Sequence, residues 1–196
     1  CKSPYQAVWA VEGDIQGCFD NISHRILLQK VWRMGIHDKR VLKIISQMLK
    51  AGYIERDLYH KTETGTPQGG ILSPLLSNIY LNDFDWYVGR TYMEPHRKCK
   101  HKCNDTRRLK WAGTTPKYNF RYADDWVVLT STEKEAFRMK RELTKYFRQK
   151  LKLELSQEKT YVTDLRKGGI HFIGYIVKAE RKRKTPDPAT WTEHLV

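Results

Sequence analysis

The sequence has 196 residues, of which 40% are hydrophobic and 12% aromatic, enough to build a folded core. It carries 36 Lys and Arg against 22 Asp and Glu, a net charge of +14, which indicates a polyanionic partner and favours nucleic acid over an anionic membrane. No apolar run approaches the roughly 18 residues of a membrane span, and no secretory signal opens the chain. Four cysteines are too few and too unevenly spaced for a disulfide framework. These features predict an intracellular protein.

Hydrophobic spacing, together with helix start and stop signals, predicts alternating strands and helices. In the first half we expect a buried strand at residues 7–11, helices at 23–35 and 38–51, a short hairpin at 53–64, a loop at 65–70 and a helix from 73. In the second half we expect a basic insertion at about 92–117, a hairpin at 118–129, a helix at 132–147, strands at 151–155, 159–163 and 170–177, and a basic tail from 181. This order predicts an α+β fold with helices against one face of a mainly antiparallel sheet.

The stretch FRYADDWVVLT places Asp124 and Asp125 side by side in an apolar, strand-like run. Adjacent strand residues point to opposite faces, so both carboxylates project together only on a tight turn. Two close carboxylates repel unless a proton or a divalent cation relieves them, and oxygen ligands suit Mg²⁺. A solvated turn is the alternative, because Asp is common in turns. Asp14 also follows an apolar strand, and three converging carboxylates would suit two Mg²⁺ ions roughly 3.5–4 Å apart.

Several motifs, in order, resemble the palm of a reverse transcriptase. They are DIQGCF at 14–19, TPQGGILSPLLSNIYL at 66–81 and YADD at 122–125. From about residue 8 to 177, the basic insertion excepted, the chain resembles the reverse transcriptase/maturases encoded by group II introns. The resemblance implies a palm with part of the fingers over residues 1–180, a basic linker or tail over 181–196, and no thumb. Polymerisation is therefore expected of a longer parent protein, with the segment alone in doubt.

The resemblance also implies a metal site. Asp14, Asp124 and Asp125 would hold two Mg²⁺ ions, which Mn²⁺ can replace, and Ile15 would offer its backbone carbonyl. One ion would lower the pKa of the primer 3′-hydroxyl, and the other would neutralise the departing pyrophosphate. Lys159, in LELSQEKT, matches the lysine expected to donate a proton or stabilise charge at that leaving group. The alternative is a solvated lysine, which is common on so basic a chain.

The resemblance implies a nucleotide site beside these carboxylates. Phe19 would lie under the sugar and exclude a 2′-hydroxyl, although the position also suits a core phenylalanine. Gln68 would contact the incoming nucleotide, and Gly69 would let the backbone approach it closely, whereas without the family PQGG is simply a turn. Ile15 and Tyr122 of YADD belong to the same predicted substrate site.

Two further segments are candidates for contact with nucleic acid. FIGY resembles the hairpin that grips the primer strand, with a buried strand as the alternative, and its candidate residues are Phe172, Gly174 and Tyr175. The basic insertion contains four potential zinc ligands, namely His96, Cys99, His101 and Cys103. They alternate too tightly for a structural zinc site and lack a matching second CxxC-type pair, which favours a basic loop that touches RNA phosphates.

These observations leave three functional readings. The first is an RNA-directed DNA polymerase of intron retrohoming, with template RNA, a DNA primer and dNTPs as partners. The second is a splicing maturase that grips intron RNA without needing synthesis, and the third is a reverse transcriptase of a retron or CRISPR-associated lineage. Three carboxylates on a cationic chain favour the polymerase, because RNA binding alone gives no reason to keep them. The resemblance favours a bacterial cytoplasm, with an organelle as the alternative, and leaves the oligomeric state open.

Overall fold

The computed structural model describes residues 7–50, 53–55, 58–60, 64–66, 71–93 and 117–179. Their main sheet has four antiparallel strands in the order β4-β5-β1-β6. The strands are β1 (Trp9–Gly13), β4 (Tyr118–Tyr122), β5 (Asp125–Thr130) and β6 (Tyr161–Asp164). Two separate hairpins pair β2 (Tyr53–Glu55) with β3 (Leu58–His60), and β7 (Ile170–Phe172) with β8 (Tyr175–Val177).

The helices are α1 (His24–Arg33), α2 (Lys39–Lys50), α3 (Ser73–Val88) and α5 (Glu133–Tyr146). Single π-helical turns extend two of them, η1 (Gly89–Met93) after α3 and η2 (Phe147–Leu151) after α5. Pro74 occupies the first turn of α3, where its missing N–H costs nothing. Thr132 caps α5 by accepting a hydrogen bond from the backbone N–H of Glu135, as the sequence predicts.

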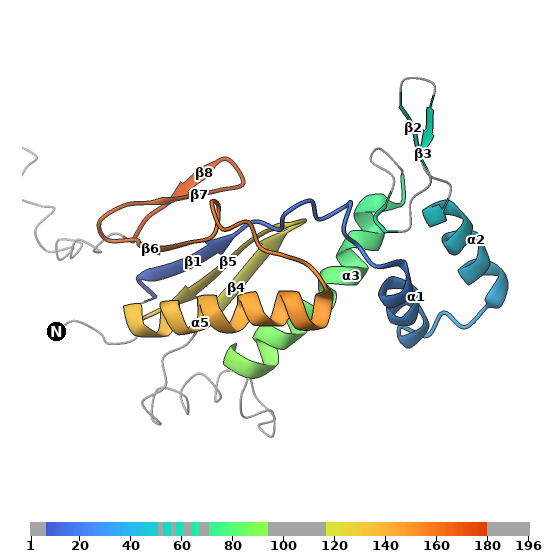
Figure 1. Ribbon diagram of the computed structural model, residues 1–196. Coiled ribbons are helices and arrows are strands. Elements are labelled where there is room, and N and C mark those ends of the chain that lie inside the picture. The colour runs from blue at the N-terminus through green and yellow to red at the C-terminus, as the bar shows by residue number, and fades with distance from the viewer. Residues whose placement is uncertain are drawn as a thin grey trace, which may run out of the picture.

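Alternate residues of the central strands face two different cores. Val11, Trp126 and Val128 point to the side covered by α3 and α5, where they join the larger core. Ala10 and Val127 point to the other side, where they pack with Leu165 and Ile170. Figure 1 shows α5 along one face of the sheet and the β7–β8 hairpin over the other. The predicted α+β architecture is confirmed, and the hairpin covers a face that the prediction left open.

Helix α3 links the sheet to the elements that lie beyond its end, α1, α2 and the β2–β3 hairpin (Figure 1). Between α1 and α3, the Lys30 ammonium contacts the Asp83 carboxylate at 3.0 Å and the Tyr80 carbonyl, and it lies over the Tyr80 ring. Burial lowers the pKa of Lys30, and its hydrogen bond and ion pair with Asp83 oppose that shift. None of the helices described combines the length and apolar character needed to cross a membrane.

Two predicted strands differ from the structure. Residues 151–155 form no strand of the sheet, because Leu151 ends η2, Lys152 turns the chain with a left-handed φ of 55°, and Leu155 makes only an isolated bridge with Ile15. The alternating leucines of this segment are buried in the larger core, which explains why they mimic a strand. Residues 170–177 form two strands, β7 and β8, joined by a turn. Four residues weighed as potential zinc ligands, the tail from 181, Gln68 and Gly69 lie outside the described residues.

Candidate active site

The acidic residues meet where β1 and β5 lie side by side. The last pair of that ladder is Gly13 with Trp126, and one further step sets Asp14 opposite Asp125. A side chain at position 13 would collide with the indole of Trp126, since an added Cβ would lie 2.4 Å from the ring. Gly13 therefore lets this buried tryptophan close the core directly beneath the two carboxylates.

The turn between β4 and β5 carries the second acidic residue. Tyr122 pairs with Asp125, so the turn has only two residues, Ala123 and Asp124. Ala123 is in the left-handed region with φ of 53°. The structure thus confirms the predicted hairpin with the acidic pair at its turn, and Tyr122 lies beside Asp125 with 63% of its surface exposed.

A returning segment places Lys159 against Asp14. The backbone N–H of Ser156 donates to the Asp14 carbonyl at 2.9 Å, and that of Gln16 donates to the Glu154 carbonyl at 2.9 Å. The following turn brings the Lys159 ammonium to 3.0 Å from the Asp14 carboxylate. The hydrogen bond to Asp14, and then its charge, raise the pKa of Lys159. Lys159 therefore remains an ammonium at neutral pH and contacts Asp14, while its expected place at the leaving pyrophosphate stays a prediction.

The three aspartates lie close enough to perturb neighbouring groups. Desolvation, and then the charges of Asp124 and Asp14, raise the pKa of Asp125, while Lys159 opposes that shift. Burial, and then the charge of Asp124, raise the pKa of the Cys18 thiol to about 12. Cys18 is therefore a neutral core side chain beneath the acidic residues rather than a thiolate ligand.

A divalent metal ion suits the chemistry of this site. Carboxylates are hard oxygen donors, and a cation would remove the mutual repulsion that, after desolvation, raises the pKa of Asp125. Among the residues that the structure describes, however, no group of three or more His, Cys, Asp or Glu side chains is arranged as a set of metal ligands. Asp14, Asp124 and Asp125 lie near one another, but their side chains do not form such a set. Asp14 pairs with Lys159 instead. Ile15, the other predicted ligand, is buried, and it bridges to Leu155 through its backbone.

The loop after Asp14 meets the segment that begins TPQGG. The backbone N–H of Thr66 donates to the Phe19 carbonyl at 2.7 Å, and that of Gly65 donates to the Ile22 carbonyl at 2.8 Å. Gly65 has φ of 89°, and an added Cβ would lie 2.8–2.9 Å from backbone atoms of Phe19 and Asp20. Phe19 itself is half-buried. Glycine is therefore required where the two predicted substrate segments touch.

The FIGY segment turns over the other face of the sheet. Phe172 packs against the smaller core, and Phe172 pairs with Tyr175 across the two-residue turn Ile173–Gly174. Tyr175 is 75% exposed. The segment thus combines a partly buried phenylalanine with an exposed tyrosine, and its role in gripping the primer strand stays a prediction.

Sequence reasoning missed one residue beside the acidic turn. Arg121 lies in β4, and its side chain, 10% exposed, binds Asp85 of α3 and the Ala123 carbonyl. The available signal was a charged residue within an apolar strand, directly before YADD. Such a charge must find partners when it is buried, yet the sequence does not show which carboxylate provides one.

The fold agrees with the comparison of the sequence with known families. Residues 1–177 match the model of the family described as "Reverse transcriptase (RNA-dependent DNA polymerase)". The chain therefore belongs to the reverse transcriptase family.

Individual relatives confirm the predicted resemblance to group II intron proteins. The chain is 37% identical to "Group II intron-encoded protein LtrA" of Lactococcus lactis subsp. cremoris, with 89% of this chain and 36% of the relative covered. It is 34% identical to "Protein YkfC" of Escherichia coli, covering 89% and 48%, and 31% identical to "Putative COX1/OXI3 intron 1 protein" of Saccharomyces cerevisiae, covering 91% and 25%. The chain thus spans from a quarter to about half of the length of these relatives.

Solved structures share the fold at low sequence identity. The structure of apo telomerase from Candida tropicalis matches with a TM-score of 0.60 at 14% identity, covering 90% of this chain and 32% of that one. Telomerase from Candida albicans, in complex with a fragment of telomeric RNA, also gives 0.60, at 15% identity, and covers 87% and 29%. Similarity at this level supports a reverse transcriptase palm with part of the fingers.

Proposed function

We propose that this chain is the catalytic palm of an RNA-directed DNA polymerase that extends a DNA primer on an RNA template with dNTPs and two Mg²⁺ ions. The observation that carries the proposal is the β1–β5 register, which gathers Asp14 and Asp125 beside Asp124. The raised pKa of Asp125 supports a site built to meet a cation, because neighbouring carboxylates contribute to it. Membership of the reverse transcriptase family supports the reaction type.

Each residue of the site has a proposed part in this reaction. The three aspartates, with the Ile15 carbonyl, would hold the metal ions, which when bound supply Lewis acidity at the primer hydroxyl and at the leaving pyrophosphate. The Lys159 ammonium would move from Asp14 toward the pyrophosphate, where it can donate a proton or stabilise charge. Phe19 would limit the space at the sugar, and Tyr122 would contact the substrate from the exposed side of β4.

We further propose that the parent protein acts in group II intron mobility and assists splicing of the intron RNA. The similarity to the Lactococcus lactis intron-encoded protein supports this role, as does the net charge of +14. The bacterial relatives support a cytoplasmic place of action. A maturase without synthesis is the second candidate, because the basic composition fits RNA binding. It is less favoured because it leaves the acidic residues without a task.

The test of the polymerase is primer extension on an RNA template with dNTPs and Mg²⁺. It compares this chain, and a longer version that carries its natural flanking sequence, with their Asp124→Asn variants. We expect Asp124→Asn to lower extension by about 1000-fold or more, because a metal ligand supplies several kcal/mol of transition-state stabilisation. RNA binding, measured by filter retention at several salt concentrations, should remain within about twofold of the parent value.

A matched control replaces another exposed carboxylate of the same loop as Lys159. Glu158→Gln removes the same charge outside the acidic cluster and should leave extension unchanged. If the longer version binds RNA yet never extends a primer, or if Asp124→Asn extends normally, the polymerase proposal fails and the maturase becomes the better account.

A further inference from the structure

The acidic turn adopts a conformation that an alanine does not favour. Ala123 has φ of 53°, and left-handed backbone costs a residue with a Cβ free energy that surrounding contacts must offset. Asp124 follows directly, so the direction of its carboxylate depends on how firmly this turn is held. Besides the β4–β5 pairing, the side chain of Arg121 contacts the backbone of this turn.

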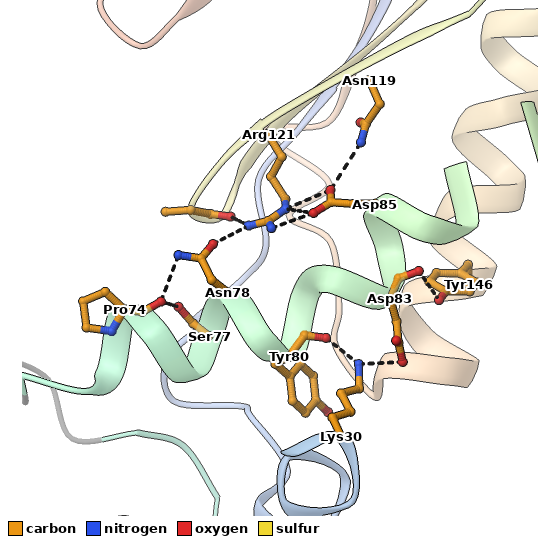
Figure 2. A network of polar contacts seen from close by, with 11 residues as sticks. Lys30, Pro74, Ser77, Asn78, Tyr80, Asp83, Asp85, Asn119, Arg121 and Tyr146 are labelled. Atoms are coloured by element: carbon orange, nitrogen blue, oxygen red, sulfur yellow. Dashed lines mark hydrogen bonds and ion pairs between the residues drawn. The ribbon is translucent and has the colours of Figure 1, made fainter. Parts of the chain in front are cut away.

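Arg121 binds the turn and helix α3 at the same time. Its Nη1 donates to the Ala123 carbonyl at 2.7 Å and to the Asn78 side-chain oxygen at 2.8 Å. Its Nε and Nη2 donate to the Asp85 carboxylate at 3.0 and 2.7 Å, a bidentate pair that fixes the plane of the guanidinium. Figure 2 shows Asn78 and Asp85 projecting from α3 toward Arg121.

Asn78, one of the two partners on α3, is itself oriented. Asn78 donates to the Pro74 carbonyl at 3.0 Å, so its amide oxygen is left to accept from Arg121. Asp85 is already fixed by the bidentate pair with Arg121, and Asn119 of β4 adds a longer hydrogen bond at 3.3 Å. Asn78 and Asp85 lie seven residues apart, two helical turns, and therefore on one face of α3. The helix thus offers Arg121 a preformed receptor.

The side chains of Arg121 and Asp125 point to opposite faces of the sheet. It pairs with Trp126 across the β4–β5 ladder, whereas Asp125 pairs with Tyr122. Neighbouring positions of a strand face opposite sides, so Arg121 points to the helix side and Asp125 to the other. Arg121 therefore contacts the backbone of the turn from beneath.

We propose that Arg121 is a positioning residue, which holds the Ala123–Asp124 turn on helix α3 so that the carboxylates of Asp124 and Asp125 keep the spacing that a metal ion requires. This proposal rests on the proposed function, in which the contacts of Arg121 with Asp85 and Asn78 would keep the metal ligands in place. Mg²⁺ demands near-ideal octahedral geometry, so a small rotation of the turn should weaken its binding. Residues that orient metal ligands typically contribute 10–100-fold to metal affinity or activity.

The test compares Arg121→Lys with Asn119→Ala. Lysine keeps the charge but loses the fork that binds the turn and Asp85 together. Asn119→Ala removes a hydrogen bond to the same carboxylate from the same strand and touches nothing in the turn. Mn²⁺ binding to this chain is followed by the loss of the free-ion electron paramagnetic resonance signal, and the thermal midpoint is recorded for each variant. In the longer version, the Mg²⁺ concentration for half-maximal primer extension is measured.

We expect Arg121→Lys to weaken Mn²⁺ binding by about 10-fold or more and to raise the half-maximal Mg²⁺ concentration in parallel. Asn119→Ala should change neither value beyond about twofold. Asn78→Ala, a change at an exposed helix position, serves if Arg121→Lys does not fold, and should shift both values in the same direction by less.

Equal metal binding by Arg121→Lys and the parent, or an equal loss in Asn119→Ala, would overturn the proposal while leaving the polymerase intact. The Asp124→Asn variant distinguishes the two failures. If Asp124→Asn also binds Mn²⁺ normally, the carboxylates are not metal ligands, and the proposed function and this inference both fall.

Discussion

Two hairpins of this chain turn in two residues each, and they differ in what holds them. In the β4–β5 hairpin, Ala123 has φ of 53°; in the β7–β8 hairpin, Ile173 and Gly174 have φ of 52° and 77°. The first turn is bound from below by the buried Arg121. In the second turn, Ile173 is 47% exposed and nothing lies within 4 Å of a Cβ added at Gly174.

The two turns thus share a left-handed backbone geometry but differ in the contacts around it. Both turns place a side chain in a disfavoured region, yet only the acidic turn is tied to a helix by a charged network (Figure 2). A fixed turn suits carboxylates that must hold a metal ion at short distances. A turn with free space around it suits contact with a strand of nucleic acid whose position varies. This division between the two hairpins fits the proposed function.

The largest expected effect comes from removing the carboxylate that anchors Arg121. Asp85→Ala leaves a guanidinium that is 10% exposed without its ion-pair partner. A broken buried pair costs about 3–5 kcal/mol, and because Asp85 is one-third exposed we expect about 2–3 kcal/mol of lost unfolding free energy. Urea denaturation followed by circular dichroism measures the loss.

The matched change in the second hairpin is Tyr175→Ala, at a side chain that is 75% exposed. It should alter the free energy of unfolding by no more than about 0.5 kcal/mol. Equal losses in the two variants would mean that the Arg121 network holds its turn no more firmly than the exposed hairpin holds its own.

Sequence patterns predicted the parts of the fold that depend on periodicity. The strand before Asp14, the hairpin around YADD and the capped helix after it are found near the predicted residues, as β1, β4–β5 and α5. Each of these follows from local signals that tertiary contacts support rather than oppose.

The remaining features depend on contacts between distant residues. Leu153 and Leu155 alternate like a strand, yet their periodicity reflects burial of an irregular segment behind η2. The pairing of Arg121 with Asp85 joins positions 36 residues apart, and no spacing rule connects a strand residue to a helix carboxylate. Gly65 was predicted only as part of a loop; its need for glycine comes from the backbone of Phe19 and Asp20.

A smaller effect is expected from exchanging glycine and alanine in the two turns. Gly174→Ala places a Cβ at φ of 77° without a clash, so it should cost about 0.5–1 kcal/mol after the lower unfolded-state entropy of alanine is counted. Ala123→Gly removes a Cβ at φ of 53° and should gain a similar amount. Thermal unfolding of both variants measures the two values.

Gly168→Ala is the control for this pair, because its surroundings are equally open and its φ is outside the left-handed region. It should be neutral or slightly stabilising. A loss of stability in Ala123→Gly would show that the first turn needs its methyl group, and the comparison of strain in the two turns would no longer hold.

The smallest effect concerns the acidic pair, which the second hairpin lacks. The pKa of Asp125 is raised by desolvation and by Asp124 and Asp14, so the folded state binds a proton more tightly than the unfolded state. The free energy of unfolding should therefore fall as the pH rises from the ordinary aspartate pKa through the raised pKa of Asp125. Asp125→Asn removes this dependence, and without divalent ions it should be more stable than the parent at about pH 7 and no more stable at about pH 3.

Urea denaturation at the two pH values measures the difference, and adding Mg²⁺ should reduce it at neutral pH by stabilising the parent alone. If Asp125→Asn is instead less stable than the parent at neutral pH without metal, the carboxylate stabilises the fold. The repulsion among Asp14, Asp124 and Asp125, which makes this turn costly and a cation useful, would then be absent. The ion pair of Arg121 with Asp85 would then serve the stability of the fold and not the spacing of the carboxylates.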